Sequence, residues 1–354
     1  MLSKLTIVIP SFERQEYLLR QVNYWANKNV KVIILDGSKN KWSHIGFANV
    51  NIEYFHIPES IENRFLFAST RIYTEYAVLL SDDELFISSA LESCINYLDH
   101  NIDTVSCKGV ALGFNYFNGQ VFGDDVYPTL RNSSSLHQST ARARMLSHMY
   151  PYNMTTLWAV IKKNVFIATL KAMGSGGPYK SAAIGEVQTS LLTSYFGKCH
   201  ILDELMWLRS AENKNIWWDA GPLSIVQWYT DIRNYAEVQK VFDSIDAQIF
   251  FSDKAMFREW LIESMDAYVN AYGGATPISI NTVLNAIKRC IPPKIKLAIK
   301  KNLHRNQDLT LQFNATPLMD AVKVMAASGV TVDFQELANI ERIVTDFHKN
   351  RVMN

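Results

Sequence analysis

The stretch Tyr76-Ala-Val-Leu-Leu-Ser-Asp-Asp-Glu84 decides the fold class of this 354-residue chain. Its first five residues are apolar or aromatic and predict a short buried strand over 76–80, and a serine and three acidic residues follow at once. Carboxylates that crowd at the end of a strand raise one another's pKa unless a cation lies between them. Mg²⁺ binds proteins through one or two carboxylates together with phosphate oxygens. The stretch therefore predicts a metal–phosphate site at the end of a strand.

A solvated turn is the alternative interpretation of the same residues. Ser81-x-x-Glu84 has the spelling of a capping box, in which two side chains cap the start of a helix. Leu85-Phe-Ile87 still separates Glu84 from the next helix, however, and Ser89-x-x-Glu92 is the better capping box for that helix. The sequence therefore favours metal and phosphate binding at the acidic cluster.

Two earlier strands end in polar residues in the same way. Apolar runs over 5–10 and 30–35 predict these strands, and the polar residues after them are Ser11, Glu13, Arg14, Asp36 and Ser38. Asp36 offers a carboxylate that could accept an N–H group of a nucleotide base, and a plain Asp-Gly turn is the alternative. A strand and a helix separate Asp36 from Asp82, which suits one nucleotide held at its base and at its diphosphate.

Short apolar strands alternate with helical patterns in this part of the chain. Further strands are predicted at 52–57 and about 104–112, and helices at 15–27, 62–75 and about 89–100. The alternation is typical of a mainly parallel α/β sheet flanked by helices. Ligands of such sheets bind beyond the carboxyl ends of the strands, where the polar residues lie.

The rest of the chain is predicted to become helical. Residues 114–150 have a loop-like composition, and then come a strand at about 155–162, a helix at about 163–173, a break at Gly174–Pro178, a helix near Glu186 and a strand near 200–208. Helical patterns follow at 234–246, 252–271, 316–328 and 334–349. We predict a catalytic α/β domain over 1–230 and a helical region over 231–354 that serves a membrane surface, an acceptor or oligomerisation.

Three segments together resemble the start of a family 2-type glycosyltransferase with the GT-A fold. They are Thr6-Ile-Val-Ile-Pro-Ser-Phe-Glu-Arg14, Ile33-Ile-Leu-Asp-Gly-Ser38 and Tyr76–Glu84, and the resemblance covers roughly residues 4–210. It implies a Rossmann-like, mainly parallel central sheet, a nucleotide-sugar donor (UDP-sugar foremost) and a divalent metal, Mg²⁺ or Mn²⁺. It also implies an inverting displacement at the anomeric carbon.

The resemblance assigns roles to residues at the strand ends. The residues that would contact the nucleotide are Pro10, Ser11, Phe12, Glu13, Asp36 and Asp82. Asp82 and Glu84 would take the DXD role at the metal, and Asp83 would take part in catalysis near the donor sugar. The family usually has Asn at the position of Glu13 and Asp at that of Glu84.

A general base must take the proton of the acceptor hydroxyl, because a protonated alcohol is a poor nucleophile. In the family that the chain resembles, an acidic pair opens a helix after a Gly-rich loop. The matching segment is Ile184-Gly-Glu-Val-Gln-Thr-Ser-Leu-Leu192, in which Glu186 begins the pair and Val187 replaces its Asp. Glu186 is therefore the predicted base, with Asp203 as the fallback. The alternative for Glu186 is a charge that only favours the first turn of a helix.

Basic residues are candidates for stabilising the negative charge of the diphosphate as it leaves. Arg64 and Arg71 lie on the predicted helix before the acidic cluster, and Arg209 follows a later strand. Arg142 and Arg144 are candidates for contact with a charged acceptor, and Gly174–Gly177 is predicted to be a mobile loop near it. For each arginine a surface cation is the alternative.

Composition disfavours several classes of protein. Lys and Arg (35) balance Asp and Glu (34), so we expect no nucleic-acid partner. Four cysteines without a C-x-x-C pair predict neither a zinc site nor a disulfide framework. The chain has no apolar run near the ~18–20 residues of a membrane span. It also has no signal-peptide pattern after Met1, so we expect a cytoplasmic protein.

The segment 293–305 is a basic amphipathic helix candidate. Ile295, Ile299 and Leu303 share one helical face and lysines flank them. Such helices bind anionic membrane surfaces, which predicts a peripheral position at the inner face of the membrane. A helix that packs its apolar stripe on the protein is the alternative.

Taken together, the sequence predicts a metal-dependent, inverting hexosyltransferase-type enzyme of surface polysaccharide biosynthesis. It would move a sugar from an NDP-sugar to a hydroxyl of a saccharide or lipid-linked glycan. Two alternatives stay open: a nucleotidyltransferase that makes the sugar nucleotide, and a non-catalytic glycan-binding protein on a degenerate GT-A fold. The oligomeric state does not follow from the residues.

Overall fold

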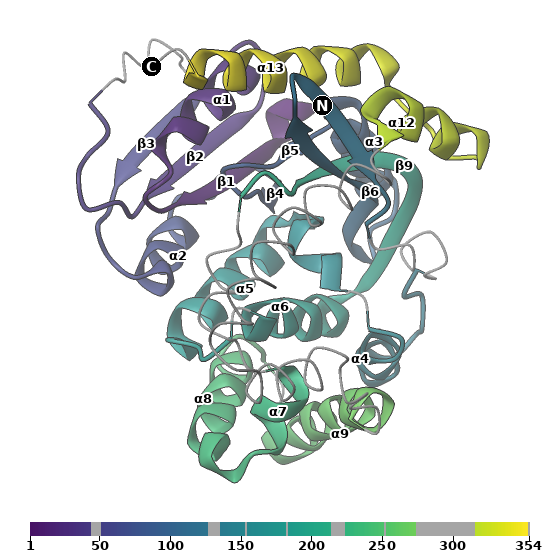
Figure 1. Cartoon of the computed structure of the whole chain (residues 1–354). Helices are drawn as coiled ribbons and strands as arrows, with labels where there is room; N and C mark the ends of the chain where they lie inside the picture. Colours follow the sequence, from purple (N-terminus) through teal and green to yellow (C-terminus); the bar gives the residue numbers. More distant parts are fainter. Residues whose placement is uncertain are drawn as a thin grey trace, which may run out of the picture.

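The computed structural model describes residues 1–43, 51–126, 135–152, 154–181, 183–213, 224–250, 253–273 and 316–352. Within them ten strands form one sheet, in the order β10-β7-β6-β8-β4-β1-β2-β3, with β9 beside β6 and β5 beside β9 (Figure 1). Helices flank this sheet and follow it in the chain. The predicted α/β class, with its central sheet and C-terminal helices, is confirmed.

Four parallel strands form one half of the sheet: β1 (Leu5–Ser11), β2 (Lys31–Asp36), β3 (Ile52–His56) and β4 (Tyr76–Leu79). β1 lies between β2 and β4, so its residues are covered on both faces. Ile7 and Ile9 enter one hydrophobic cluster and Val8 enters another. Because strand residues alternate between faces, burial on both sides requires the unbroken apolar run seen in the sequence.

The other half of the sheet is mixed. β6 (Thr104–Phe117) is antiparallel to β7 (Gln120–Asp124) and to β8 (Val160–Lys162), and it is parallel to β9 (Lys198–Ser210). β8 also pairs with β4 and so joins the two halves. The short strands β5 (Leu85–Phe86) and β10 (Thr316–Pro317) pair with β9 and β7.

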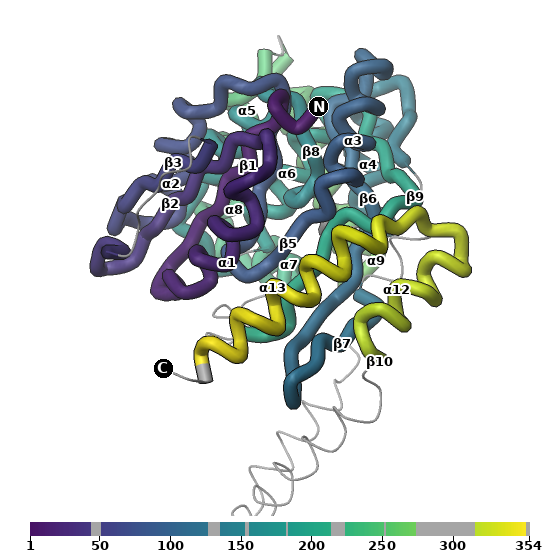
Figure 2. Tube along the Cα trace, turned by 90° about the horizontal axis from the view of Figure 1, so that it is seen from above, coloured from purple at the N-terminus to yellow at the C-terminus, as the bar shows by residue number. Residues whose placement is uncertain are grey.

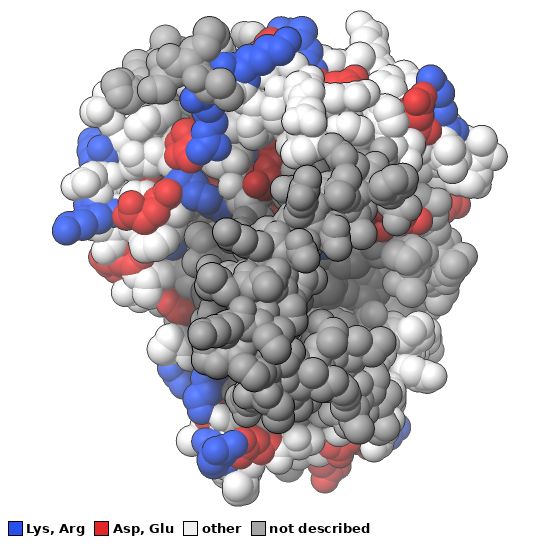
Figure 3. Space-filling view, in the orientation of Figure 1, with Lys and Arg blue, Asp and Glu red and all other residues white. Residues whose placement is uncertain are grey.

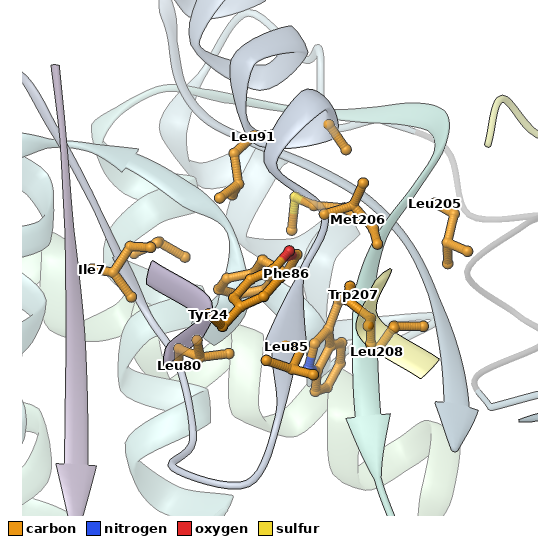
Figure 4. Packing of buried hydrophobic residues seen from close by; sticks show 14 of the residues in the cluster. Ile7, Tyr24, Leu80, Leu85, Phe86, Leu91, Leu205, Met206, Trp207 and Leu208 are labelled. Atoms are coloured by element: carbon orange, nitrogen blue, oxygen red, sulfur yellow. The ribbon is translucent and has the colours of Figure 1, made fainter. Parts of the chain in front are cut away.

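Helices cover the sheet and continue beyond it. Their bounds are α1 Gln15–Trp25, α2 Ile61–Ser69, α3 Ser88–His100, α4 Ala141–Met149, α5 Lys163–Gly176, α6 Ala183–Phe196, α7 Ile225–Thr230, α8 Tyr235–Asp246, α9 Lys254–Tyr272, α12 Leu318–Ala327 and α13 Phe334–Val352. Short 3₁₀ turns lie at Leu2–Lys4, Met154–Trp158 and Ile232–Asn234. Figure 4 shows how Tyr24 of α1, Phe86 and Trp207 pack together between these layers.

The last helices share cores with the earlier elements. Leu318, Leu337 and Ile340 belong to the same cluster as Ile7, and α13 runs beside α1 (Figure 2). α8 and α9 pack instead with α4 and α6 in a second cluster. The division of the chain at residue 230 stays a prediction, and segment 293–305 lies outside the described residues.

Three predicted features differ from the structure. The stretch 114–150 holds the end of β6, the whole of β7 and α4 in addition to loop. The strand expected at 155–162 is a 3₁₀ turn followed by three residues of β8. Gly174 and Gly176 lie in the last turn of α5, where they pack against Leu66 and Gln188, so these glycines do not form the predicted loop.

The start of α3 is capped from α13. α3 begins at Ser88 without a cap from its own preceding side chain, so Ser89-x-x-Glu92 does not serve as its capping box. Glu336 accepts hydrogen bonds from Ser88 N (2.8 Å), Ser88 Oγ (2.6 Å) and Lys28 Nζ (2.6 Å). A carboxylate stabilises the start of a helix when it accepts hydrogen bonds from backbone N–H groups that have no partner within the helix.

Glu336→Ala is therefore expected to lower the free energy of unfolding by about 2–3 kcal/mol, because it leaves several donors unpaired. Urea unfolding measured by circular dichroism tests this. Asp320→Ala on α12 is the matched control: Asp320 makes an exposed i,i+3 pair, and its loss should change stability by less than about 0.5 kcal/mol. Equal effects of the two substitutions would contradict the capping role.

Candidate functional site

The ends of β1, β2 and β4 meet at one edge of the sheet. Ser11 lies opposite Asp36 in the register of β1 and β2, and its Oγ donates to Asp82 Oδ2 at 2.7 Å. Asp36 and Asp82 are both fully buried. The structure therefore brings together the two carboxylates that the sequence placed in one site, with Ser11 between them.

Asp36 is held by three donors. Its Oδ1 accepts from Ser38 N at 2.9 Å, and its Oδ2 accepts from Gln15 Nε2 at 2.8 Å and from Tyr54 OH at 2.7 Å. Burial raises the pKa of Asp36, but hydrogen bonds from Ser38, Tyr54 and Gln15 outweigh it and hold the pKa below its usual value. Asp36 is thus a fixed acceptor. Gln15 and Tyr54 had no predicted role.

The turn after β1 carries the other predicted nucleotide contacts. Glu13 has a left-handed backbone, with φ at 54°, a conformation that Asn adopts more readily than Glu. The turn is fixed because Glu13 N donates to Ser38 Oγ at 2.8 Å and Lys39 N donates to Glu13 Oε1 at 2.8 Å. Phe12 is half exposed, at 50%, and Pro10 is partly buried. An exposed ring beside buried carboxylates gives a ligand a flat apolar surface.

Arg64 of α2 links the ends of β1 and β2 through hydrogen bonds to their backbones. Its Nη1 donates to Ser11 O at 2.6 Å and to Leu35 O at 2.9 Å. Gly37 leaves room for it, since a Cβ there would lie 2.6 Å from the guanidinium carbon. Burial lowers the pKa of Arg64. Arg64 therefore contributes at least a structural clamp at the site where a phosphate contact was predicted.

Arg14 lies among the acidic residues after β4. Its Nη2 is 2.6 Å from Asp82 Oδ1, and its Nη1 donates to Asp83 Oδ2 at 3.0 Å. Asp83 Oδ2 also accepts from Asn213 Nδ2 at 2.8 Å. Burial raises the pKa of Asp82 to about 7, with Arg14 opposing the rise and Asp83 adding to it. The sequence placed Arg14 at a strand end but predicted no partner for it.

The backbone of the acidic turn is held by α1. Gln21 Nε2 donates to Asp82 O at 3.0 Å and to Glu84 O at 2.5 Å, and Arg20 Nη2 donates to Asp83 O at 2.5 Å. Arg20 is itself paired with the buried Glu212 at 2.7 Å. These bonds fix the backbone of three consecutive acidic residues, so their side chains can be presented with little motion.

Glu84 is directed toward β9. Its Oε2 accepts from Trp207 Nε1 at 2.9 Å, and Trp207 stacks on Trp158 with ring centroids 4.5 Å apart. Burial raises the pKa of Glu84 to about 8, with Asp83 adding to the rise and Arg209 opposing it. One of its carboxylate oxygens is thus engaged by an indole.

Asp82 fits a cation through one oxygen. The described residues contain no group of three or more His, Cys, Asp or Glu side chains arranged around a metal position. Asp82 Oδ1, however, is buried and accepts no hydrogen bond of good geometry. That oxygen lies 2.6 Å from Arg14 Nη2, so it fits Mg²⁺ or Mn²⁺ only if Arg14 gives way and phosphate oxygens and water complete the shell.

Glu186 lies in the first turn of α6 with one oxygen unused. Its Oε2 is buried and has no hydrogen-bond partner. Burial raises the pKa of Glu186 to about 8, and Arg209 opposes the rise. Since Arg209 acts on the pKa of both Glu84 and Glu186, the end of β9 lies near both carboxyl groups.

Tyrosines border Glu186. Burial and then Glu186 raise the pKa of Tyr152, and burial, Tyr272 and Glu186 raise that of Tyr268. The rings of Tyr152 and Tyr268 meet edge to face at 5.2 Å, and those of Tyr268 and Tyr272 lie 4.8 Å apart. Glu186 therefore lies beside an aromatic surface, of the kind that packs against sugar rings.

Three other predicted arginines have structural partners. Arg71 lies over the rings of Phe55 and Phe67. Arg142 pairs with Glu263 of α9 at 2.7 Å. Arg144 is buried and donates to four backbone carbonyls, those of Gln138, Ser139, Ser194 and Tyr195. The structure shows no contact between these three and the acidic strand end, and the fallback base Asp203 lies within β9, exposed.

Among the described residues that are visible in Figure 3, Lys and Arg lie interspersed with Asp and Glu, and these residues form no broad patch of one sign. No helix among the described residues has the length and apolar character needed to cross a bilayer.

No family model and no curated protein matches the chain. Among solved structures, the chain is similar to residues 1–349 of Staphylococcus aureus TarS in complex with UDP-GlcNAc. The two sequences are 14% identical, the match covers 75% of this chain and 72% of that chain, and the TM-score is 0.50. The same TarS fragment without a named ligand (11% identity, 78% and 76% covered) gives a TM-score of 0.47, and its complex with UDP (11%, 75% and 88%) gives 0.43. The first of these likenesses shows that the chain has the GT-A type of glycosyltransferase fold.

Proposed function

We propose that the protein is a family 2-type glycosyltransferase that moves a hexose from a nucleoside-diphosphate sugar, foremost a UDP-sugar, to a hydroxyl of a saccharide or lipid-linked glycan. The observation that carries the proposal is the convergence of Asp36 and Asp82 on Ser11. The likeness to a GT-A structure that holds UDP-GlcNAc supports the choice of donor.

The donor would span the ends of β2 and β4. Asp36, which Ser38 N holds in place, would accept an N–H group of the base, and the half-exposed Phe12 would offer the base a flat neighbour. Asp82, with Glu84 as a second candidate, would hold the proposed divalent cation. When bound, that cation would neutralise the diphosphate and stabilise its charge as it leaves.

The acceptor would enter beside Glu186. The hydroxyl oxygen forms a bond to the anomeric carbon while the bond from that carbon to the diphosphate oxygen breaks and its electron pair stays on the diphosphate. Glu186 Oε2 takes the hydroxyl proton, since it is an unused acceptor. The tyrosines Tyr152 and Tyr268 would orient the acceptor sugar. Direct displacement of this kind inverts the anomeric centre.

A panel of nucleoside diphosphates tests the donor. Thermal unfolding is measured with UDP, GDP, ADP, CDP or dTDP, each with and without Mn²⁺. We expect UDP with Mn²⁺ to raise the melting temperature most, because a ligand that binds only the folded state stabilises it. No shift with any nucleotide would favour a glycan-binding protein on a degenerate fold. Pyrophosphate release from an NTP and a sugar phosphate would favour a nucleotidyltransferase.

The cellular setting is a further part of the proposal. A lipid-linked acceptor would place the enzyme at the inner face of the membrane, in surface polysaccharide biosynthesis. Segment 293–305 would attach it there through its five Lys and Arg residues, with two more just before it at 288 and 289. Binding to vesicles with and without anionic lipid measures this attachment.

A further inference from the structure

Arg14 is a cation already placed among the carboxylates of the site. It is the residue that precedes α1, and its guanidinium spans Asp82 Oδ1 at 2.6 Å and Asp83 Oδ2 at 3.0 Å. The two carboxylates are buried, with side chains 0% and 11% exposed. Two like charges so close and so little hydrated need a positive charge beside them. Arg14 supplies that charge in the donor-free protein.

The contact with Asp82 is nevertheless incomplete. Asp82 Oδ1 accepts no hydrogen bond of good geometry although Arg14 Nη2 lies 2.6 Å away. The Arg14 side chain is 25% exposed, whereas the neighbouring Arg20 is fully enclosed between Glu212 and Asp83 O. Arg20 is therefore a fixed part of the scaffold, and Arg14 has an open side toward which it can move.

Arg14 and a divalent ion would compete for the same oxygen. Mg²⁺ binds oxygen at about 2.0–2.1 Å and rejects a second cation on that lone pair. The guanidinium group also matches phosphate, because its planar fork donates two parallel hydrogen bonds. A phosphate-bearing donor thus offers Arg14 a new partner when Arg14 leaves Asp82.

We propose that Arg14 is an exchangeable counter-ion, a proposal that rests on the proposed nucleotide-diphosphate donor. Without donor it neutralises Asp82 and Asp83 and lowers the affinity of this site for divalent ions. With donor it releases Asp82 and binds the diphosphate. Arg14 therefore couples metal binding to donor binding, so that the two ligands bind far better together than alone.

Arg14→Gln separates the two halves of this exchange. Mn²⁺ binding is titrated by electron paramagnetic resonance without nucleotide, and UDP binding is titrated calorimetrically at saturating Mn²⁺. We expect Mn²⁺ alone to bind about tenfold more tightly in the variant and UDP with Mn²⁺ to bind about tenfold more weakly, from the loss of one charge-assisted contact in each state. Arg14→Lys should fall between the wild type and Arg14→Gln in both titrations, since it keeps the charge without the fork.

Arg258→Gln is the matched control, because the Arg258 side chain is also 25% exposed and forms an ion pair with Asp243 at 3.1 Å, between α9 and α8. It should leave both affinities at wild-type values. If the wild type binds UDP, the exchange is overturned by either of two results in Arg14→Gln. One is Mn²⁺ binding that is unchanged or weaker, and the other is UDP binding that is unchanged. A wild type that binds no nucleoside diphosphate overturns the proposed donor instead. Circular dichroism confirms folding, and Arg14→Lys carries the test if Arg14→Gln does not fold.

Discussion

Asp82→Asn is expected to lower sugar transfer by roughly 10³-fold or more, since it removes the carboxylate that would share charge with both metal and diphosphate. The substitution keeps the shape of the side chain and an oxygen that can still accept from Ser11 Oγ. Asn is preferred to Ala here because Ala would leave a cavity beside the buried end of Arg14 as well as removing the charge. The effect then reports lost electrostatics and not lost packing.

Release of UDP from a UDP-sugar, with and without an acceptor, measures this loss. Asp103→Asn is the control: Asp103 is an exposed partner of Lys198, 58% exposed, at the far end of β9, and its loss should leave activity unchanged. Circular dichroism and the melting temperature show whether both variants fold. Wild-type transfer by Asp82→Asn would remove the acidic strand end from the chemistry and, with it, the metal proposal.

The strand ends could be predicted because local sequence encodes them. Buried parallel strands must be apolar throughout, so their ends are visible where Ser11, Asp36 and Ser81 interrupt the apolar runs. The carboxyl ends of parallel strands share one edge of the sheet, and the Ser11–Asp82 hydrogen bond follows from that geometry. The positions of the strand ends along the chain were therefore enough to predict that Asp36 and Asp82 lie in one site.

Side-chain partners from distant segments could not be predicted. Arg20 pairs with Glu212, and Glu212 accepts in turn from His348 of α13 at 2.5 Å. Nothing in the local pattern at α1 indicates such a buried ion pair, because its partners come from elements far along the chain. Arg64 was likewise assigned to phosphate, whereas its fit against Gly37 depends on the packing of α2 beneath the strand ends.

One missed element did carry a local signal. Asn118 and Gly119 join β6 to β7 and both have positive φ, at 48° and 85°. An Asn-Gly pair between strand residues favours a two-residue hairpin turn. The high content of Asn, Ser and Gly over 114–150 favoured a loop and concealed that turn.

Glu186→Gln is expected to lower kcat by about 10²–10⁴-fold while UDP binding stays at its wild-type value, because a general base acts on the acceptor and not on the nucleotide. Gln fills nearly the same space but cannot take a proton. Glu263→Gln on α9 is the matched control, since Glu263 lies at the surface, and it should keep wild-type kcat. Equal kcat in Glu186→Gln and the wild type would exclude Glu186 as the base.

The pH dependence of the wild type gives a second, independent measurement of Glu186. Burial raises its pKa to about 8, so only about a tenth of the free enzyme carries the ionised form at pH 7. With Mn²⁺ and donor saturating, so that Asp82 and Glu84 are ionised as metal ligands, transfer at limiting acceptor should therefore rise with pH and level off above about 8, and Glu186→Gln should lose this rise. The sign is reversed for stability, because a raised carboxyl pKa stabilises the fold at low pH and this contribution is lost as pH rises through about 8. The melting temperature of Glu186→Gln should accordingly gain on that of the wild type as pH rises from about 4.5 to about 8 and keep that gain above it, a change that a mere helix-capping charge would not produce.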